Sequence, residues 1–307
     1  MSEKAWENYW SSGLQSCFPK NSTADKQLEL TWRKAINQIE IPGNACLLEL
    51  GCGNGFLTSI IIDTLADKNF TLNVMDYSKV QLNDLLIKKN NKVNIVHETS
   101  IELMPYESSS INVLFSNFAF EYAETSKAIK QTARVLKPGG CFLYNVHSNC
   151  SLVSDVSTSI YDALEKIQEN KELYNNIFQI ISLKLARKEE KNKDSILKLA
   201  KQIIDELKNI DVLSNGGVAS SGVVEDILPF INISNERVSL SQLEATWENY
   251  RYYKIRIKQQ MDVGFDADSM DTLISKFIEE GIEIKVEPVL IENKVFSYML
   301  HGIKNNV

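Results

Sequence analysis

Short apolar runs alternate with helical patterns through the first half of the chain. Five of these runs have the length and composition of buried strands: 46–50, 70–76, 92–98, 111–120 and 141–147. Segments between them repeat apolar residues every three or four positions, as helices do: 56–68, 78–90 and 125–136. Strands separated by helices and short links run parallel. The pattern therefore predicts a parallel sheet covered by helices on both faces.

The pattern becomes predominantly helical after residue 147. Apolar stripes at helical spacing follow one another as far as an aromatic-rich helix at 240–261, interrupted by a predicted glycine- and serine-rich loop at 213–224. A last helix, 269–281, precedes two apolar runs joined by a short link, which predicts an antiparallel hairpin. Four regions follow from these patterns: 1–44, a helical segment or lid; 45–150, the core; 151–263, a helical insertion; and 264–307, the last helix and hairpin.

Composition narrows the class of protein. The hydrophobic share of 44 % and the charged share of 24 % are those of a globular chain, and the net charge of -7 disfavours a nucleic-acid partner. Five cysteines without a CxxC pair and only three histidines predict reduced thiols and no metal site. Neither a signal peptide nor a run of about 20 apolar residues is present, so a cytoplasmic protein without a membrane span is expected.

The stretch LLELGCGNGF places three glycines, Gly51, Gly53 and Gly55, directly after a strand and before a helix. Backbone without side chains lets a ligand approach closely. In a dinucleotide fingerprint two residues separate the second glycine from the third, but here Phe56 stands in the place of that third glycine. Asp76 ends the next strand, at the distance of about 20 residues where an acid binds ribose hydroxyls. The segment thus predicts a nucleoside-containing ligand at the carboxyl ends of the strands.

These motifs resemble those of class I S-adenosylmethionine-dependent methyltransferases. LLELGCGNG resembles their first motif and NVMDYS the second, and MPYESSSINVLFSNFAFEYAE and ARVLKPGGCFLYNV resemble the segments around the fourth and fifth strands. The resemblance covers about 45–147. It implies an α/β fold: a doubly wound, mostly parallel seven-stranded sheet with a C-terminal antiparallel hairpin and a helical insertion after the fifth strand. That insertion would cap the substrate or form a homodimer interface.

The resemblance also implies roles at the cofactor site. The three glycines would wrap the methionine portion, Glu49 would orient it, Asp76 would bind the ribose, and Asn117 would lie along the amino-acid end. Ser100 stands where many members carry an aspartate near the adenine amino group, and Ile101 would cover the adenine. The predicted cofactor-binding residues are Glu49, Gly51, Cys52, Gly53, Asn54, Gly55, Asp76, Tyr77, Ser100, Ile101 and Asn117.

Candidate catalytic residues follow the fourth and fifth strands. A base is needed only if the nucleophile arrives protonated, and His147, which ends a strand and titrates near neutrality, is the first candidate. Glu121 and Tyr122 come next. Tyr9, Trp10, Trp247 and Tyr250 are predicted to line the substrate. A rim or capping role for His147, and core packing for the helical aromatic residues, are the structural alternatives.

The functional prediction is methyl transfer from S-adenosylmethionine to an oxygen or nitrogen atom of a small molecule. Protein or tRNA methylation is the alternative substrate class. A non-catalytic member that uses the fold for binding, or as a partner subunit, is an alternative of another kind. A nicotinamide oxidoreductase is a third possibility, which the glycine spacing opposes.

Overall fold

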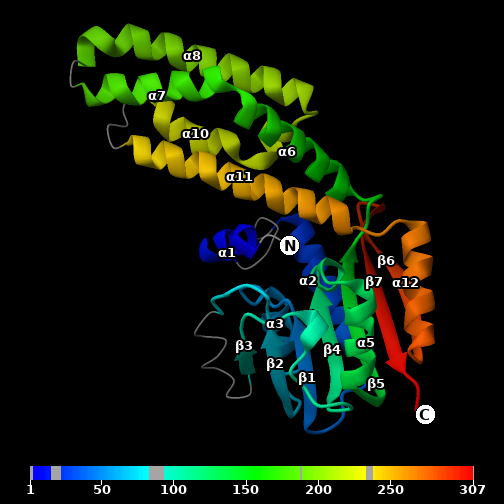
Figure 1. Cartoon of the computed structure of the whole chain (residues 1–307). Helices are drawn as coiled ribbons and strands as arrows, with labels where there is room; N and C mark the ends of the chain where they lie inside the picture. The colour runs from blue at the N-terminus through cyan, green and yellow to red at the C-terminus, as the bar shows by residue number, and fades with distance from the viewer. Residues whose placement is uncertain (1–2, 15–21, 83–92, 187–188, 233–237, 307) are drawn as a thin grey trace. The chain divides into compact units, whose positions relative to one another are not determined.

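The computed structural model describes residues 3–14, 22–82, 93–186, 189–232 and 238–306. Within it the chain forms two compact units, one made of Met1–Ser154 and Asp262–Val307 and the other of Asp155–Met261. We call them the sheet unit and the helical unit, and Figure 1 shows the elements of each. Each unit is described by itself.

The sheet unit is built on seven strands in the order β3-β2-β1-β4-β5-β7-β6. Their bounds are β1 Ala45–Leu50, β2 Phe70–Met75, β3 Val93–Val96, β4 Ile111–Asn117, β5 Leu136–His147, β6 Ile282–Ile291 and β7 Lys294–Lys304. The first five run parallel, and β7 pairs antiparallel with both β5 and β6. The predicted seven-stranded sheet with a C-terminal hairpin is confirmed. Strand order reverses at β1, which pairs with both β2 and β4 and so creates the crevice where such sheets bind ligands.

Helices cover both faces of this sheet (Figure 1). α2 (Thr23–Asn37) and α3 (Phe56–Thr64) pack on one face, and α5 (Thr125–Val135) and α12 (Ala267–Glu279) on the other. Trp32 of α2 is fully buried, so the second half of the predicted N-terminal segment is part of the core. This leaves α1 (Glu3–Ser11) as the element of that segment that can cover a site. The predicted helix 78–90 falls largely on 83–92, which lies outside the described residues.

Two single-turn helices complete the strand ends of the sheet unit. The helix η1 (Ile101–Leu103) follows β3, and η2 (Phe120–Tyr122) follows β4. Ser100 begins η1, and its side chain accepts a hydrogen bond from the Glu102 backbone N–H. Both turns come directly after the carboxyl end of a strand, which places their side chains at the rim where ligands bind.

The helical unit packs six helices around an interior of apolar side chains. Their bounds are α6 Leu152–Glu169, α7 Lys171–Leu185, α8 Glu189–Leu213, α9 Gly217–Ser221, α10 Val223–Ile231 and α11 Leu240–Val263. The loop predicted at 213–224 is wrong, because α9 and the start of α10 occupy most of it. Gly216 and Gly222 adopt left-handed φ angles of 82° and 79° on either side of α9, so the glycines separate helices here and do not form an open loop.

No helix in the described part of the chain has both the length and the apolar composition needed to cross a bilayer.

Candidate functional site

The glycine-rich turn joins β1 to α3 at the carboxyl edge of the sheet. Gly51, Gly53 and Gly55 have φ angles of 65°, 49° and 93°, which side chains other than glycine disfavour. The backbone N–H groups of Gly51 and Cys52 both donate to the Met75 carbonyl, at 2.8 and 3.1 Å. The turn is therefore anchored to the end of β2, one residue before Asp76.

Two of the glycines also make room for neighbouring chain segments. A Cβ atom on Gly51 would stand 2.1 Å from the Cβ of Ala119, which follows β4. At Gly53 the same atom would stand 2.6 Å from the indole of Trp10. The absence of side chains at these glycines thus allows close packing of α1 and of the segment after β4, as well as the approach of a ligand.

Asp76 ties the glycine turn to the end of β2. Its Oδ2 accepts from the Gly53 N–H and its Oδ1 from the Ser78 N–H, both at 2.8 Å. Burial raises the pKa of Asp76, and the two backbone donors partly oppose that rise. Each carboxylate oxygen offers a second acceptor direction, so this side chain can still accept from a pair of hydroxyl groups.

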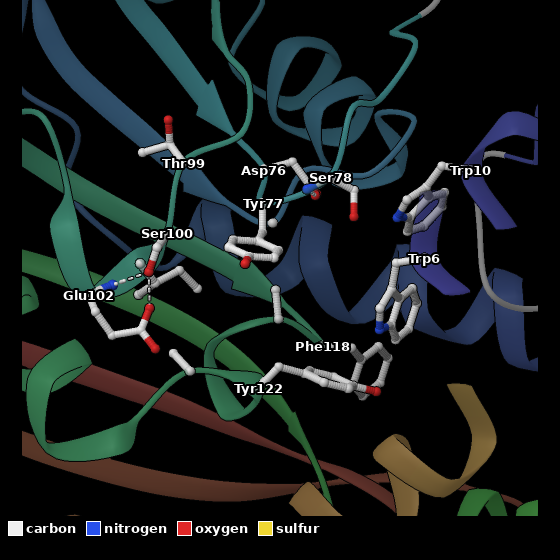
Figure 2. Close-up of a pocket in the computed structure, with 14 residues that line it drawn as sticks. Trp6, Trp10, Asp76, Tyr77, Ser78, Thr99, Ser100, Glu102, Phe118 and Tyr122 are labelled. Atoms are coloured by element: carbon white, nitrogen blue, oxygen red, sulfur yellow. Dashed lines mark hydrogen bonds between the residues drawn. The ribbon is translucent and has the colours of Figure 1, made fainter. Parts of the chain in front are cut away.

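A cavity of about 300 Å³ opens beside Asp76. It is lined by Trp6, Trp10, Gly51, Asp76, Tyr77, Ser78, Thr99, Ser100, Ile101, Glu102, Phe118, Ala119, Tyr122 and Ala123. Figure 2 shows Thr99, Ser100 and Glu102 at one end, Asp76 and Tyr77 between, and Trp6, Trp10 and Tyr122 at the other. The cavity therefore has a polar end and an aromatic end, both within the sheet unit.

The aromatic end joins α1 to the turn after β4. The Trp6 ring meets the Tyr122 ring edge-on at 5.3 Å and stacks with the Trp10 ring at 6.2 Å. Phe118 lines the same cavity and stacks on the His147 ring at 4.2 Å. Such a wall offers apolar area and π faces, which suit flat, apolar or cationic groups.

Asn54 fastens α1 to the glycine turn. Its side-chain amide donates to the carbonyls of Trp10 and Leu14, each at 2.8 Å, and its Oδ1 accepts from the Gln81 N–H at 3.0 Å. The residue is 2 % exposed. Asn54 thus holds the segment that carries Trp10, and it positions the cavity wall through that contact.

Glu49 and Cys52 are buried beside the cavity and are not among its lining residues. The Glu49 Oε2 accepts from the Thr58 hydroxyl at 2.6 Å, in the first turns of α3. Burial raises the pKa of Glu49 to about 8. Its carboxyl is therefore mostly protonated at neutral pH, and in this structure it connects β1 to α3.

Among the three candidate catalytic residues, Tyr122 lines the cavity, whereas His147 and Glu121 do not. Burial lowers the pKa of His147 to about 3 and raises that of Glu121 to about 8, so both are uncharged at neutral pH. The Glu121 Oε1 accepts from the His147 backbone N–H at 3.0 Å. Its Oε2 has no hydrogen-bond partner among the described residues. This geometry favours the rim or capping role for His147.

Asn117 and Tyr9 lie near the cavity without lining it. The Asn117 Oδ1 accepts from the Trp32 indole N–H at 2.9 Å and from the Asn145 amide at 3.0 Å, which ties β4 to α2 and β5. The Tyr9 ring meets the Trp10 ring at 4.9 Å and supports it.

Trp247 and Tyr250 belong to the interior of the helical unit. The Trp247 ring meets the Tyr174 ring at 5.1 Å, and Tyr250 is 2 % exposed with its hydroxyl donating to the Val223 carbonyl at 3.5 Å. Within this unit both side chains take the core-packing alternative.

Comparison with known proteins gives a consistent assignment. Residues 48–144 match the sequence model of a methyltransferase domain family. This span contains the glycine turn, Asp76 and most of the lining of the cavity. Through this domain the match supports the resemblance of the chain to the class I S-adenosylmethionine-dependent methyltransferases.

Three relatives that match the chain over this region carry more specific names. A malonyl-[acyl-carrier protein] O-methyltransferase from Buchnera aphidicola is 26 % identical over 38 % of this chain and 45 % of its own length. A demethylmenaquinone methyltransferase from Leptospira interrogans is 29 % identical over 38 % and 49 %. A dimethylglycine N-methyltransferase from Parasynechococcus marenigrum is 26 % identical over 34 % and 38 %. The chain spans less than half the length of each of these relatives.

The residues that line the cavity fit S-adenosylmethionine, the cofactor of that class. S-adenosylmethionine combines a nucleoside with a sulfonium, and the cavity combines hydroxyl and carboxylate acceptors with an aromatic wall. Asp76 would hold the ribose, while Ser100, Ile101 and Glu102 would meet the purine. Among the described residues no cluster of histidine, cysteine or acidic side chains could hold a metal ion.

Seven predicted residues come together in the cavity: Trp10, Gly51, Asp76, Tyr77, Ser100, Ile101 and Tyr122. Trp6, Phe118 and Glu102 lie there too, although the sequence did not single them out for the site. Trp6 stands one helical turn before Trp10, a spacing that placed both on one face of α1. Glu102 stands two residues after the expected purine position, and the tight turn of η1 brings it back to Ser100.

Proposed function

We propose that the protein transfers a methyl group from S-adenosylmethionine to an oxygen or nitrogen atom of a small-molecule acceptor. The observation that carries the proposal is the cavity with two unlike ends. Polar acceptors around Asp76 and Ser100 suit a nucleoside, and the aromatic wall of Trp6 and Tyr122 suits the reacting end and an organic acceptor. When bound, the cofactor supplies an electrophilic methyl group.

The protein's contribution is alignment. Asp76 would accept hydrogen bonds from the ribose hydroxyls while it holds the glycine turn through the Gly53 N–H. Trp6 and Trp10 would cover the methyl group from the side of α1 and exclude water from it. Holding donor and acceptor in a reactive geometry can lower the barrier by several kcal/mol, roughly 7 to 11 at the upper end.

Tyr122 is the candidate catalytic residue that can touch an acceptor, because it lines the cavity. Glu121 and His147 would act indirectly, by positioning Phe118 in the wall of the cavity. Glu121 holds the His147 backbone, and the His147 ring supports Phe118, so together they shape the wall behind Phe118. An imidazole with a pKa of about 3 is a weak base, so an acceptor that arrives already deprotonated, or as a neutral amine, is favoured.

The names of the relatives support an acceptor that is a small molecule or is attached to a carrier protein. They differ in the acceptor, so they do not indicate which atom receives the methyl group. One is named for malonyl-[acyl-carrier protein], one for demethylmenaquinone and one for dimethylglycine. The described lining of the cavity contains no lysine or arginine. An acceptor whose reacting end is a neutral amine therefore fits this lining better than a free carboxylate.

Calorimetric titration of the purified protein with S-adenosylmethionine, S-adenosylhomocysteine and NAD tests the proposal. We expect the first two to bind and NAD not to, and Asp76→Ala to weaken binding by about 100-fold because a charged acceptor is lost. Asp205→Ala removes an exposed acid of the helical unit and serves as the control. A folded protein that binds neither sulfur ligand would overturn the proposal. Binding without methylation of any acceptor in a broad screen would favour the non-catalytic alternative.

A further inference from the structure

Three aromatic rings form a corner at one end of the cavity. The Trp6 and Trp10 rings lie nearly parallel, with an angle of 25° between their planes, whereas the Tyr122 ring stands at 87° to that of Trp6. Figure 2 shows these side chains beside Phe118 in the cavity wall. Aromatic rings set at right angles present electron-rich faces in two directions, which is how aromatic cages bind methylated cations.

Packing and hydrogen bonds hold this corner in place. The Trp10 indole lies against Gly53, where an added Cβ atom would stand 2.6 Å from it, and the Asn54 amide donates to the Trp10 carbonyl at 2.8 Å. Trp6 is one helical turn earlier on α1 and is 9 % exposed. The methyltransferase domain model covers 48–144, so α1 brings two of the three rings from outside the matched domain.

The charges around the cavity favour a cation. Its described lining contains no lysine, arginine or histidine, and it includes the carboxyl groups of Asp76 and Glu102. Partial burial raises the pKa of Glu102, but hydrogen bonds to the carboxylate outweigh burial and leave the pKa lowered, so this group is ionised at neutral pH. Behind Phe118, burial lowers the pKa of His147 to about 3, and its ring therefore adds no positive charge.

The orientation of a nucleoside in the cavity would bring a positive charge to the aromatic corner. The ribose ring carries its base at one end and its 5′ substituent at the other. With the ribose at Asp76 and the base at the polar end, the 5′ substituent extends toward Trp6 and Tyr122 (Figure 2). In S-adenosylmethionine this substituent contains a sulfonium. When the methyl group leaves, the electron pair of its bond stays on sulfur, and the product is a neutral thioether.

We propose that Trp6 and Tyr122 bind the positive charge of the cofactor's sulfonium through their ring faces, so that the site favours the methyl donor over its demethylated product. This inference rests on the proposed function, because it assumes that the cofactor occupies the cavity. It gives α1 a role beyond the exclusion of water, since loss of the charge during methyl transfer would weaken the hold of the corner on the product.

Three ligands that share their nucleoside and amino-acid ends test the inference by calorimetry. S-adenosylmethionine has a sulfonium, S-adenosylhomocysteine a neutral thioether, and sinefungin a protonated amine in the corresponding place. The quantity to compare is the Kd of the thioether divided by the Kd of the sulfonium. Trp6→Leu should lower this ratio by about 10-fold relative to the wild type, whereas Trp6→Phe, which keeps an aromatic face, should leave it within about twofold. Sinefungin should follow the sulfonium in both variants.

The leucine and phenylalanine variants are matched, because both shorten Trp6 and only one removes the aromatic face. Ile101→Ala is a second control: it truncates the lining at the polar end, so it should weaken all three ligands by the same factor and leave the ratio unchanged. Circular dichroism shows whether each variant is folded. If Trp6→Leu does not fold, Tyr122→Leu and Tyr122→Phe provide the same comparison.

Two results would overturn the inference and leave the proposed function standing. One is an equal ratio in the wild type and the leucine variant, and the other is a fall of the same size in the leucine and phenylalanine variants, which would show that the bulk of the side chain matters and its ring face does not. A folded wild type that binds none of the three ligands would overturn both the inference and the proposed function.

Discussion

The two units of the chain bury different kinds of side chain. The interior of the helical unit is an apolar cluster that runs through α6, α7, α8, α10 and α11. The sheet unit buries acids and other polar groups at the ends of its strands, among them Glu49, Asp76, Glu121, Asn145 and His147. Asp76 directly follows β2 and His147 ends β5. Glu49 and Asn145 lie one and two residues before the ends of β1 and β5, and Glu121 lies in η2, the turn after β4.

Burial of a polar group costs free energy unless hydrogen bonds replace its water. The sheet unit meets that cost with specific contacts, such as the two backbone donors on Asp76 and the hydroxyl donor on Glu49. The described part of the helical unit buries fewer such groups, namely Ser157, Ser214 and Arg256. The two units therefore differ in what they bury. The sheet unit buries polar groups beside a cavity, whereas the interior of the helical unit consists mainly of packed apolar side chains.

The largest effect that can test this comparison is a truncation inside the helical unit. Ile203 is fully buried there, so Ile203→Ala should lower the free energy of unfolding by roughly 3 to 4 kcal/mol in chemical denaturation. The affinity for S-adenosylhomocysteine should stay within twofold, because the cavity is lined by the sheet unit. The adjacent Ile204 is 39 % exposed, so Ile204→Ala should cost less than about 1 kcal/mol. A loss of affinity in Ile203→Ala at temperatures where the protein is folded would break the comparison.

A smaller effect should appear in the pH dependence of the sheet unit. Burial raises the pKa of Glu121 from 4.5 to about 8, so between these values the folded chain holds a proton that the unfolded chain has released. The contribution of this group to stability is full below pH 4.5 and is lost as pH rises toward 8. Glu121→Gln does not titrate. Between pH 6 and pH 8 the free energy of unfolding of the wild type should therefore fall by roughly 2 kcal/mol more than that of Glu121→Gln.

Denaturation curves of both proteins at several pH values measure this difference. Glu124→Gln changes an exposed neighbouring acid and should follow the wild type. Parallel stability profiles for wild type and Glu121→Gln would show that Glu121 is not held protonated by the fold.

The smallest predicted effect concerns Tyr250. Its hydroxyl contacts the Val223 carbonyl at 3.5 Å and also hydrogen-bonds the Asp226 side chain, so Tyr250→Phe should cost about 1 kcal/mol of stability. If the ring serves packing alone, methyl transfer by this variant should equal that of the wild type. A raised KM for the acceptor with unchanged stability would instead place Tyr250 at the substrate, as the sequence first suggested, and would break the division between the units.

The local pattern of the chain was enough to predict most of the sheet unit. Strand and helix periodicity, the glycine turn and the acid at the end of β2 depend on residues close together in sequence, and the parallel sheet and Asp76 followed from them. The same reasoning was wrong at 213–224, where glycine and serine predicted a loop. There the chain forms α9, and Gly217 packs closely against the backbone of Ser159, a contact that no local pattern reveals.

The sequence by itself determined the class of fold and the edge of the sheet at which a nucleoside would bind, because both follow from chain order and strand direction. Only the tertiary structure decided what each polar residue does there. It turned Asn54 toward Trp10, tied Asn117 to Trp32, placed Phe118 over His147, and set Glu102 at the polar end of the cavity. Burial and hydrogen bonding set the charge and the free donors of a side chain, and both come from partners that are mostly distant in the chain.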